Sequence, residues 1–284
     1  MLKVGIIHSV DFDNRLISMK NKNKIEYFYL QNGLLKKFQR YLKPRTFVEF
    51  DFNETKDKCA NVLAYKINFF IRIFKKVGFR VEVFYDLSII RSGVKDLLTN
   101  LDNIMFLDLE MTMQSFDSPK DFKSEIIQAG YLITDNKGND LERKNYYIKP
   151  TLFPKLNKRT TKFLSIDDEI IKNEGISFND FYNEFRDALI KYNNPSIIVW
   201  GKNDILALKS CYEINNLTPL NPNFINLLQV HKNYFNLKND LGLFNAYKNY
   251  TGKDLDQEHD ALADAFMTKN VFFEFKKETN KKMA

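Results

Sequence analysis

Two acidic residues lie inside an apolar segment, Phe106-Leu-Asp-Leu-Glu-Met-Thr112. The apolar residues around Asp108 and Glu110 predict a strand buried on both faces, and residues two apart on a strand point to the same face. Two like charges side by side cost on the order of several kcal/mol unless a cation neutralises them. Carboxylate oxygens favour magnesium or manganese. The pair therefore predicts a divalent-metal site, although a strand end whose acids reach solvent has the same spacing.

A third acid, Asp204, stands where a strand is followed by a helix. Residues 196–200 predict a buried strand, Gly201 a turn, and residues 203–215 a helix. Sites are often built where strand ends meet helix starts. Alternatively, Asp204 serves only the dipole of its own helix.

The last chemical signal is Glu258-His-Asp-Ala-Leu-Ala-Asp-Ala265. A helix starting near His259 places small residues where it can approach the sheet closely, and it puts Asp260 and Asp264 on one face. A histidine beside a metal carboxylate can act as a general base near neutral pH. We expect Asp260 to face solvent. The bland alternative is an Ala-rich surface helix.

These residues need a scaffold, and from residue 103 onward the pattern alternates between strands and helices. Strands are expected at 125–133 and 145–149, joined by a turn at 135–138, and a helix at 178–192. A polar loop at 114–123 follows the first strand. The pattern predicts an α/β domain whose sheet begins with an antiparallel meander.

Residues 1–68 predict a small β-barrel. Strands are expected at 4–12, 15–19, 24–30, 46–52 and 59–67, with a short helix or structured loop at 32–42. Five short strands with that interruption favour an OB-fold. Residues 69–103 are ambiguous between helix and strand at 69–76, then predict a strand at 79–85 and a helix at 92–98. The expected division is a barrel domain at 1–68, a connector at 69–102 and an α/β domain at 103–284.

The order of the chemical motifs is similar to that of the DEDDh family of 3′–5′ exonucleases, which includes ribonuclease T and the polymerase III proofreading subunit. The resemblance covers about residues 103–275 and rests on Asp108 and Glu110, on Asp204 in a Trp-Gly-x-x-Asp setting, and on His259 with Asp264. The segments Phe106–Thr112, Glu125–Gln128 and Tyr147–Pro150 most resemble the Eri/KapD-like branch. Asp256-Gln257-Glu258 departs from the Gly-rich, Arg-bearing lead-in of the last motif.

The resemblance implies a ribonuclease H-like mixed sheet with helices on both faces. It also implies that Asp108, Glu110 and Asp264 bind two divalent ions, Mg²⁺ or Mn²⁺, with Asp204 assisting. His259 would then take a proton from the attacking water, and the product would be a nucleoside 5′-monophosphate. Met111 and Thr112 are expected near the terminal nucleotide.

The barrel also carries a looser resemblance, to the cold-shock domain, through Gly5–Asn14, Phe47–Phe52 and Cys59–Val62. On the strand at 24–30, Tyr27 and Tyr29 share a face opposite Phe28. Tyr27 and Tyr29 are candidates to stack unpaired bases, beside a run of lysines. Equally, they could fill the barrel.

The amino-acid composition limits the classes of protein to which this chain can belong. Hydrophobic residues make up 44% of the 284 residues, which excludes global disorder. The formal net charge is +7, with 19 basic against 10 acidic residues in 1–100 and 24 against 26 in 101–284. The basic front half suggests a polyanion partner, unless lysine richness reflects only genome composition. Two distant cysteines, no signal peptide and no long apolar run predict a cytoplasmic protein without a membrane partner.

Three functions remain open from sequence. The first is an exonuclease that trims single-stranded RNA from the 3′ end, with the barrel holding the strand. The second is a DNA 3′–5′ exonuclease in repair or proofreading, since 2′-hydroxyl contacts leave no signature in the sequence. The third is a non-catalytic single-strand-binding protein on a nuclease scaffold. For the barrel alone, the alternative is that it docks protein partners or only packs on the α/β domain.

Overall fold

The computed structural model describes residues 1–22, 24–116, 118–254 and 259–281. The chain divides into two compact units. The first, the barrel unit, comprises Met1–Gly93 and Asn233–Lys238, and the second, the nuclease unit, comprises Val94–Lys232 and Asn239–Ala284. The division expected from sequence placed the end of the barrel at residue 68, which falls inside a strand.

The barrel unit contains a closed five-stranded barrel, as predicted. Its elements are β1 (Leu2–Asp11), β2 (Leu16–Asn21), β3 (Lys24–Tyr29), α1 (Asn32–Phe38), β4 (Phe47–Cys59) and β5 (Val62–Val77). The strands pair in the order β3-β2-β1-β4-β5, and a parallel β3–β5 pairing closes the barrel. Phe28, Phe50, Phe52 and Phe70 pack edge to face inside it, which is a favourable arrangement for aromatic rings.

Strand β5 explains why the sequence boundary was placed too early. It continues without a break from Val62 to Val77, and β6 (Arg80–Asp86) adds to its outer part. Phe70 and Ile73 on this continuation are fully buried in the barrel core. Residues 69–77 are therefore strand and belong to the barrel unit.

The nuclease unit is built on a five-stranded mixed sheet. Its strands are β7 (Ile104–Met111), β8 (Ile126–Thr134), β9 (Asp140–Tyr147), β10 (Ser196–Val199) and β11 (Phe224–Asn226), in the order β11-β10-β7-β8-β9. The meander β7-β8-β9 is antiparallel, whereas β10 runs parallel to both β7 and β11. Strand β7 is central, and its buried apolar residues account for the continuous hydrophobic run in the sequence.

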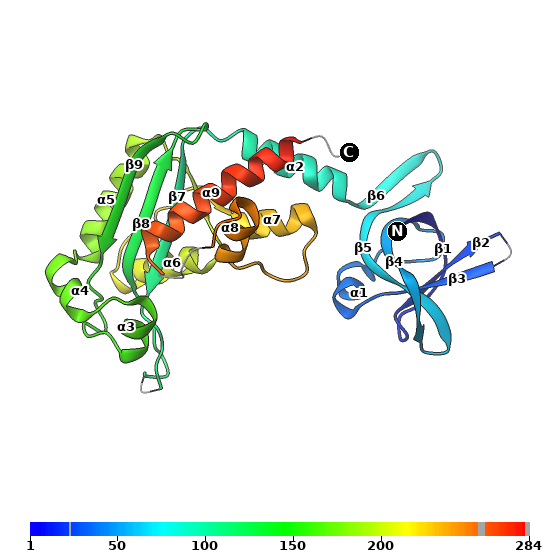
Figure 1. The fold of residues 1–284 in the computed structure, drawn as a ribbon, viewed down its shortest axis with the longest axis horizontal. Helices are drawn as coiled ribbons and strands as arrows, with labels where there is room; N and C mark the ends of the chain where they lie inside the picture. The colour runs from blue at the N-terminus through cyan, green and yellow to red at the C-terminus, as the bar shows by residue number, and fades with distance from the viewer. Residues whose placement is uncertain (23, 117, 255–258, 282–284) are drawn as a thin grey trace. The chain divides into compact units, whose positions relative to one another are not determined.

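Helices cover both faces of this sheet, as predicted (Figure 1). Helices α5 (Phe178–Lys191) and α6 (Asn203–Ile214) pack on one face, where Phe181 and Phe185 contribute to the main core. Helix α9 (Ala261–Asn280) crosses the other face, and its Phe272 meets Phe106 of β7 at 5.4 Å between ring centroids. The fold is thus the expected mixed sheet between two helical layers.

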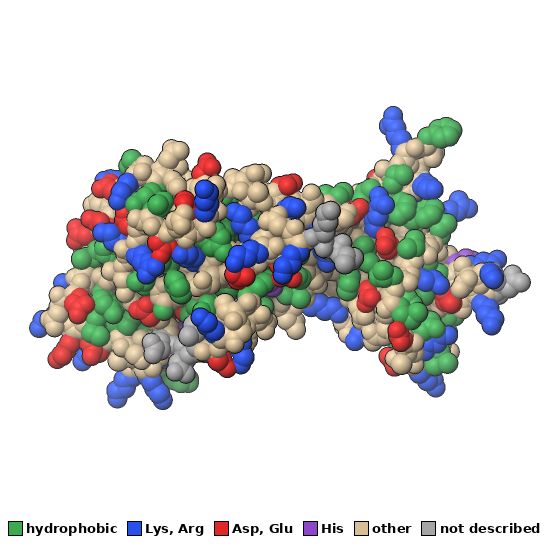
Figure 2. All heavy atoms as spheres, turned by 45° about the horizontal axis from the view of Figure 1, so that its top comes forward, with side chains coloured by type: hydrophobic (Ala, Val, Ile, Leu, Met, Phe, Trp, Pro, Cys, Tyr) green, Lys and Arg blue, Asp and Glu red, His purple; other side chains and the backbone are tan. Residues whose placement is uncertain are grey.

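The remaining helices are short connections. They are α2 (Leu87–Thr99), α3 (Lys158–Leu164), α4 (Asp168–Glu174), α7 (Leu227–Phe235) and α8 (Leu243–Thr251). Within the described ranges, no helix has the length and hydrophobicity that a bilayer crossing requires. Acidic and basic side chains are interspersed on the face shown in Figure 2, so the excess of positive charge does not form one continuous basic surface there.

Candidate active site

Strand β7 places Asp108 and Glu110 on the same side of the sheet. Glu110 is 9% exposed. Asp108 as a whole residue is half-buried, but its carboxylate is enclosed by protein atoms. The strand is hydrogen bonded on both edges, to β8 and to β10, so its register is fixed. A slip of one residue would turn both acids to the other face.

Asp204 is tied directly to β7. It is the second residue of α6, only 5% exposed, and its Oδ1 accepts a hydrogen bond from the backbone N–H of Leu109 at 3.1 Å. This bond fixes the start of α6 against the strand segment between the two β7 acids. The strand-to-helix junction predicted from sequence therefore places a third carboxylate at the site.

Helix α9 supplies the fourth carboxylate. Asp264 lies in its first turn and is 7% exposed. The helix begins at Ala261, two residues later than expected, because Asp260 is its N-cap and accepts the backbone N–H of Ala263 at 2.9 Å. Asp260 was predicted to face solvent, but it is half-buried.

Close packing brings the start of α9 onto the sheet. A Cβ atom at Gly130 of β8 would lie 2.2 Å from the backbone nitrogen of Leu262, so only glycine permits this approach. The Gln128 side chain, 1% exposed, donates to Asp260 Oδ2 at 2.7 Å and accepts the N–H of Ala261 at 3.3 Å. Strand β8 thus positions the residues that lead into Asp264.

The side chains converge into one cluster. One possible ligand atom from each of Glu110, His259 and Asp264 lies within 4.8 Å of the other two. Asp108 and Asp204 are outside this trio, but their charges act on it, because both Asp108 and Asp204 interact electrostatically with Asp264. All five residues predicted from the sequence therefore gather at one end of the sheet.

Burial and mutual repulsion raise the pKa of all four acids. Burial raises the pKa of Glu110 to about 8 and that of Asp264 to about 7, with neighbouring carboxylates adding to each shift. Burial, with repulsion from Asp204, Asp264 and Glu110, raises the pKa of Asp108 well above its usual range. The pKa of Asp204 rises to about 6 through burial, against the opposing effect of its backbone hydrogen bonds.

Among the residues that the structure describes, none forms an ion pair with any of the four acids. Asp264 Oδ1 is buried and lacks a hydrogen-bond partner within the same part of the chain. A cluster of carboxylates with unused oxygens and no cation is the donor set that a divalent metal ion satisfies.

His259 approaches the cluster from a loop. Its backbone is left-handed, with φ of 47°, and its ring stacks on Phe163 of α3 with centroids 4.3 Å apart. Burial lowers the pKa of His259, so the imidazole is neutral at pH 7 and able to accept a proton. The unusual lead-in noted at Asp256-Gln257-Glu258 lies outside the described residues.

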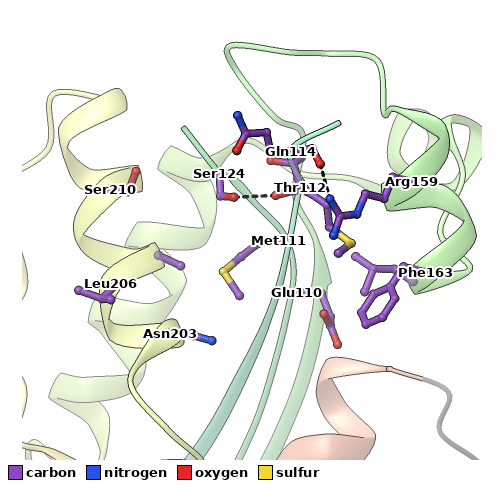
Figure 3. A pocket seen from close by; sticks show the side chains of 13 residues that line it. Glu110, Met111, Thr112, Gln114, Ser124, Arg159, Phe163, Asn203, Leu206 and Ser210 are labelled. Carbon is purple, nitrogen blue, oxygen red and sulfur yellow. Dashed lines mark hydrogen bonds between the residues drawn. The ribbon is translucent and has the colours of Figure 1, made fainter. Parts of the chain in front are cut away.

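A cavity of about 650 Å³ opens beside Glu110 (Figure 3). Helix α3 lines one side with Arg159 and Phe163, and α6 lines the other with Asn203 and Leu206. We call it the first cavity. Its size suits a small ligand whose ring packs against apolar side chains.

The two residues expected near a terminal nucleotide, Met111 and Thr112, both line the first cavity. Thr112 is 4% exposed, and its hydroxyl accepts the backbone N–H of Glu125 at 2.9 Å. Ser124 in turn donates to the Thr112 carbonyl at 2.7 Å. Thr112 therefore serves first to hold the end of β7 to β8.

Several residues at the site were not singled out from the sequence: Gln128, Arg159, Phe163 and Asn203. The last three stand on helix starts or short helices. Asn157 caps α3 by accepting the backbone N–H of Thr160, a signal that the sequence does carry in Asn157-Lys-Arg-Thr160. Gln128 lies within a buried strand, where a lone amide marks a specific hydrogen-bond partner.

The aromatic candidates of the barrel unit lie where strand alternation predicted. Phe28 is fully buried in the barrel, while Tyr27 and Tyr29 are partly exposed on its outer side. The guanidinium of Arg15 stands 4.9 Å from the Tyr29 ring centroid. Tyr27 also borders a cavity of about 310 Å³.

The family model described as RNase_T, exonuclease, matches residues 105–272. The chain belongs to this exonuclease family. It is 31% identical over 173 residues to the probable 3′-5′ exonuclease KapD of Bacillus subtilis (strain 168), covering 60% of this chain and 83% of that protein. The residues that the family model matches include all four acids and His259. The chain is a 3′–5′ exonuclease, as the sequence resemblance predicted.

Solved structures share the fold of the nuclease unit. The nuclease domain of 3′hExo, a DEDDh family member bound to rAMP, has a TM-score of 0.53 at 18% identity, over 63% of this chain and 92% of that one. Cell-death related nuclease 4 (CRN-4) has a TM-score of 0.52 at 20% identity, over 63% of this chain and 64% of that one. Family membership implies divalent metal ions, which the donor set at Glu110, His259 and Asp264 fits.

Proposed function

We propose that this exonuclease removes nucleotides from the 3′ end of single-stranded RNA and releases nucleoside 5′-monophosphates. The observation that carries the proposal is the cluster of four carboxylates and one neutral histidine at the end of β7. Their raised pKa values, together with the unpartnered Asp264 Oδ1, mark a site whose carboxylates a bound cation would stabilise in the charged form.

Two Mg²⁺ or Mn²⁺ ions would be held by Asp108, Glu110 and Asp264, with Asp204 contributing to the second. When bound, such ions stabilise negative charge on a phosphate and lower the pKa of water. Asp204 has one oxygen engaged by the N–H of Leu109, so its other oxygen is the one available. Because only one of its two oxygens is available to a metal ion, we assign Asp204 an assisting role.

His259 is the proposed general base. Its imidazole is neutral at pH 7 and lies beside Glu110 and Asp264, where it can take a proton from a water that attacks phosphorus. Phe163, stacked on the ring, limits its rotation. The terminal nucleoside would occupy the first cavity, against Met111, next to Thr112.

The preference for RNA rests on the relatives. The nuclease domain of 3′hExo is described with bound rAMP, and a related 3′-exonuclease is described as recognising the 3′ end of a histone mRNA stem-loop. Both have TM-scores of 0.53 against this chain. A single-stranded DNA substrate remains the alternative for the same site.

The barrel unit would hold the strand. Tyr27 and Tyr29, partly exposed on its outer side, offer aromatic faces for unpaired bases, and Arg15 beside Tyr29 adds a cation. We propose the chain as an OB-like nucleic-acid-binding domain followed by an exonuclease domain from about residue 103. Tyr27→Ala with Tyr29→Ala should weaken strand binding without changing the chemical step.

The test is a time course on 5′-labelled single-stranded RNA and DNA of one sequence, with Mg²⁺, with Mn²⁺ and with EDTA. Stepwise shortening of the RNA only with metal, and nucleoside 5′-monophosphates as product, is expected. Faster shortening of the DNA would reassign the substrate. Tight binding of both strands without cleavage would favour a binding protein on a nuclease scaffold.

A further inference from the structure

A second cavity of about 610 Å³ adjoins the first one. The two share Thr112 and Arg159 as lining residues, so they meet at the end of β7. The second cavity is bordered by the segment after β7 and by the turn that leads into α3. It therefore lies next to the proposed site of the terminal nucleoside, where a longer bound strand could extend.

Aromatic side chains form one wall of the second cavity. Phe122 and Phe153 are stacked, with ring centroids 5.5 Å apart and an interplanar angle of 24°. Both are partly buried, whereas Phe116 at the rim is fully exposed. An exposed phenylalanine beside a stacked pair leaves apolar ring surface for which the described residues provide no cover.

A buried acid fixes this wall. Glu125, 2% exposed, accepts the backbone N–H groups of Thr151, Leu152 and Phe153 at 2.5, 2.9 and 3.3 Å. Three hydrogen bonds to one carboxylate hold the turn at residues 151–153 rigidly. Phe153 is thus pre-positioned and would lose little conformational entropy when a flat ring packs on it.

Basic side chains also line the second cavity. Lys155, Lys158 and Arg159 are exposed, and in the described ranges none has an acidic side chain within ion-pair distance. Arg159 donates to the Gln114 carbonyl through one nitrogen and keeps its other donors. Uncompensated cations beside aromatic rings match the phosphates and bases of a single strand.

We propose that the second cavity binds the nucleotide on the 5′ side of the scissile phosphate, with its base against Phe122, Phe153 and Phe116 and its phosphate near Lys155 and Lys158. This inference rests on the proposed function, because it needs a nucleotide in the first cavity. Stacking on an aromatic face tolerates every base, so the second cavity would contribute affinity and strand length preference and little sequence selectivity.

The experiment compares two substrates on purified full-length protein with saturating metal. One is the p-nitrophenyl ester of a nucleoside 5′-monophosphate, with the sugar that the wild type cleaves. It has a single nucleoside and no 5′ neighbour. The other is a 5′-labelled hexanucleotide. Phe116→Ala and Phe153→Leu should each raise KM for the hexanucleotide, by about 5- to 150-fold for a lost stacking contact. Lys155→Ala should raise the same KM through the lost phosphate contact.

The outcome lies in the ratio of kcat/KM between the two substrates. The second subsite is supported if kcat/KM for the hexanucleotide falls relative to kcat/KM for the ester, while ester cleavage stays within about twofold of wild type. Equal losses on both substrates, or no loss on either, overturn it. Exposed Lys172→Ala and Ile190→Ala, remote from both cavities, are the matched controls. A wild type inert on both substrates would instead refute the proposed function.

Discussion

The Gln128 side chain donates a hydrogen bond to Asp260 at 2.7 Å and so links strand β8 to the N-cap residue of the helix that carries Asp264. The same amide accepts the backbone N–H of Ala261. Because Asp260 follows His259 directly, one buried amide positions both the proposed base and a proposed metal ligand.

Replacing Gln128 by leucine should therefore reduce catalysis without unfolding the protein. The change leaves the N–H of Ala261 and the Asp260 carboxylate without their buried partner, at a cost of about 1–3 kcal/mol in unfolding free energy. We expect kcat to fall by about 10- to 100-fold, as for residues that orient metal ligands. Urea denaturation and single-turnover kinetics measure the two effects. Wild-type kcat in Gln128→Leu would refute the positioning role.

Gly130→Ala tests the close approach of α9. The added methyl group would lie 2.2 Å from backbone nitrogen and must push the helix start away from β8. Overpacking of this kind costs about 1–3 kcal/mol, and the displacement should weaken Mg²⁺ binding as well. Gly33→Ala is the matched control, because nothing lies within 4 Å of a Cβ there. Equal metal affinity in both variants would show that α9 can shift without disturbing the site.

Stability of the metal-free protein should depend on pH in an unusual direction. The pKa values of Glu110 and Asp264 in the folded protein, about 8 and about 7, exceed their ordinary values, so the folded state binds more protons than the unfolded one. The contribution of these two groups to the free energy of unfolding is fully present below about pH 4, and it is lost as the pH rises toward 8. We expect a loss on the order of 2 kcal/mol or more between pH 5 and 8.5 in EDTA.

Added Mg²⁺ should reverse this loss, and more strongly at the higher pH, because binding needs the charged carboxylates. Thermal unfolding with EDTA and with Mg²⁺ at the two pH values measures it. A melting temperature that is independent of pH in EDTA would mean that the acids are already compensated.

Asp264→Asn should separate stability from activity. The substitution removes a buried charge that lacks a cation, so the metal-free variant should be more stable than wild type above pH 7. Its activity should fall by at least about 100-fold, and Mg²⁺ should no longer raise its melting temperature as much. Asp187→Asn, at an exposed position on α5, controls for charge alone. A less stable Asp264→Asn protein would point to a structural role instead.

His259→Ala distinguishes a base from a ligand. A general base contributes about 10²–10⁴-fold, so kcat should fall by that much while the affinity for Mn²⁺ stays near wild type. Since burial lowers the pKa of His259, the acid limb of the wild-type kcat/KM profile should lie below pH 6.5 and disappear in the variant. Loss of Mn²⁺ binding in His259→Ala would assign the imidazole to the metal.

The sequence was most informative where chemistry and periodicity coincide. Asp108 and Glu110 interrupt an apolar run, and Asp204 and Asp264 begin helices, so both residue type and element were predictable. The start of α9 was placed two residues early because Asp260 caps the helix through the N–H of Ala263, and its other oxygen accepts a hydrogen bond from Gln128, 132 residues away.

Short helices and strand ends were less predictable. Helix α3 has seven residues and little apolar periodicity, yet it carries Arg159 and Phe163 to the first cavity. The end of the barrel was missed because β5 runs for 16 residues through a segment that suits either helix or strand. In both cases packing against distant segments, which local sequence does not encode, decides the outcome.

The dispersal of the acids has a consequence for synthesis of the chain. Asp108 and Glu110 are made early, on a strand whose register depends on β8 and on β10, and Asp264 is made last, on α9. A nascent chain that ends before His259 has the first three carboxylates without the histidine or the fourth acid. With the roles proposed for His259 and Asp264, hydrolysis requires α9 to be docked on the sheet, so a copy synthesised only up to α8 should not cleave nucleic acid near the ribosome.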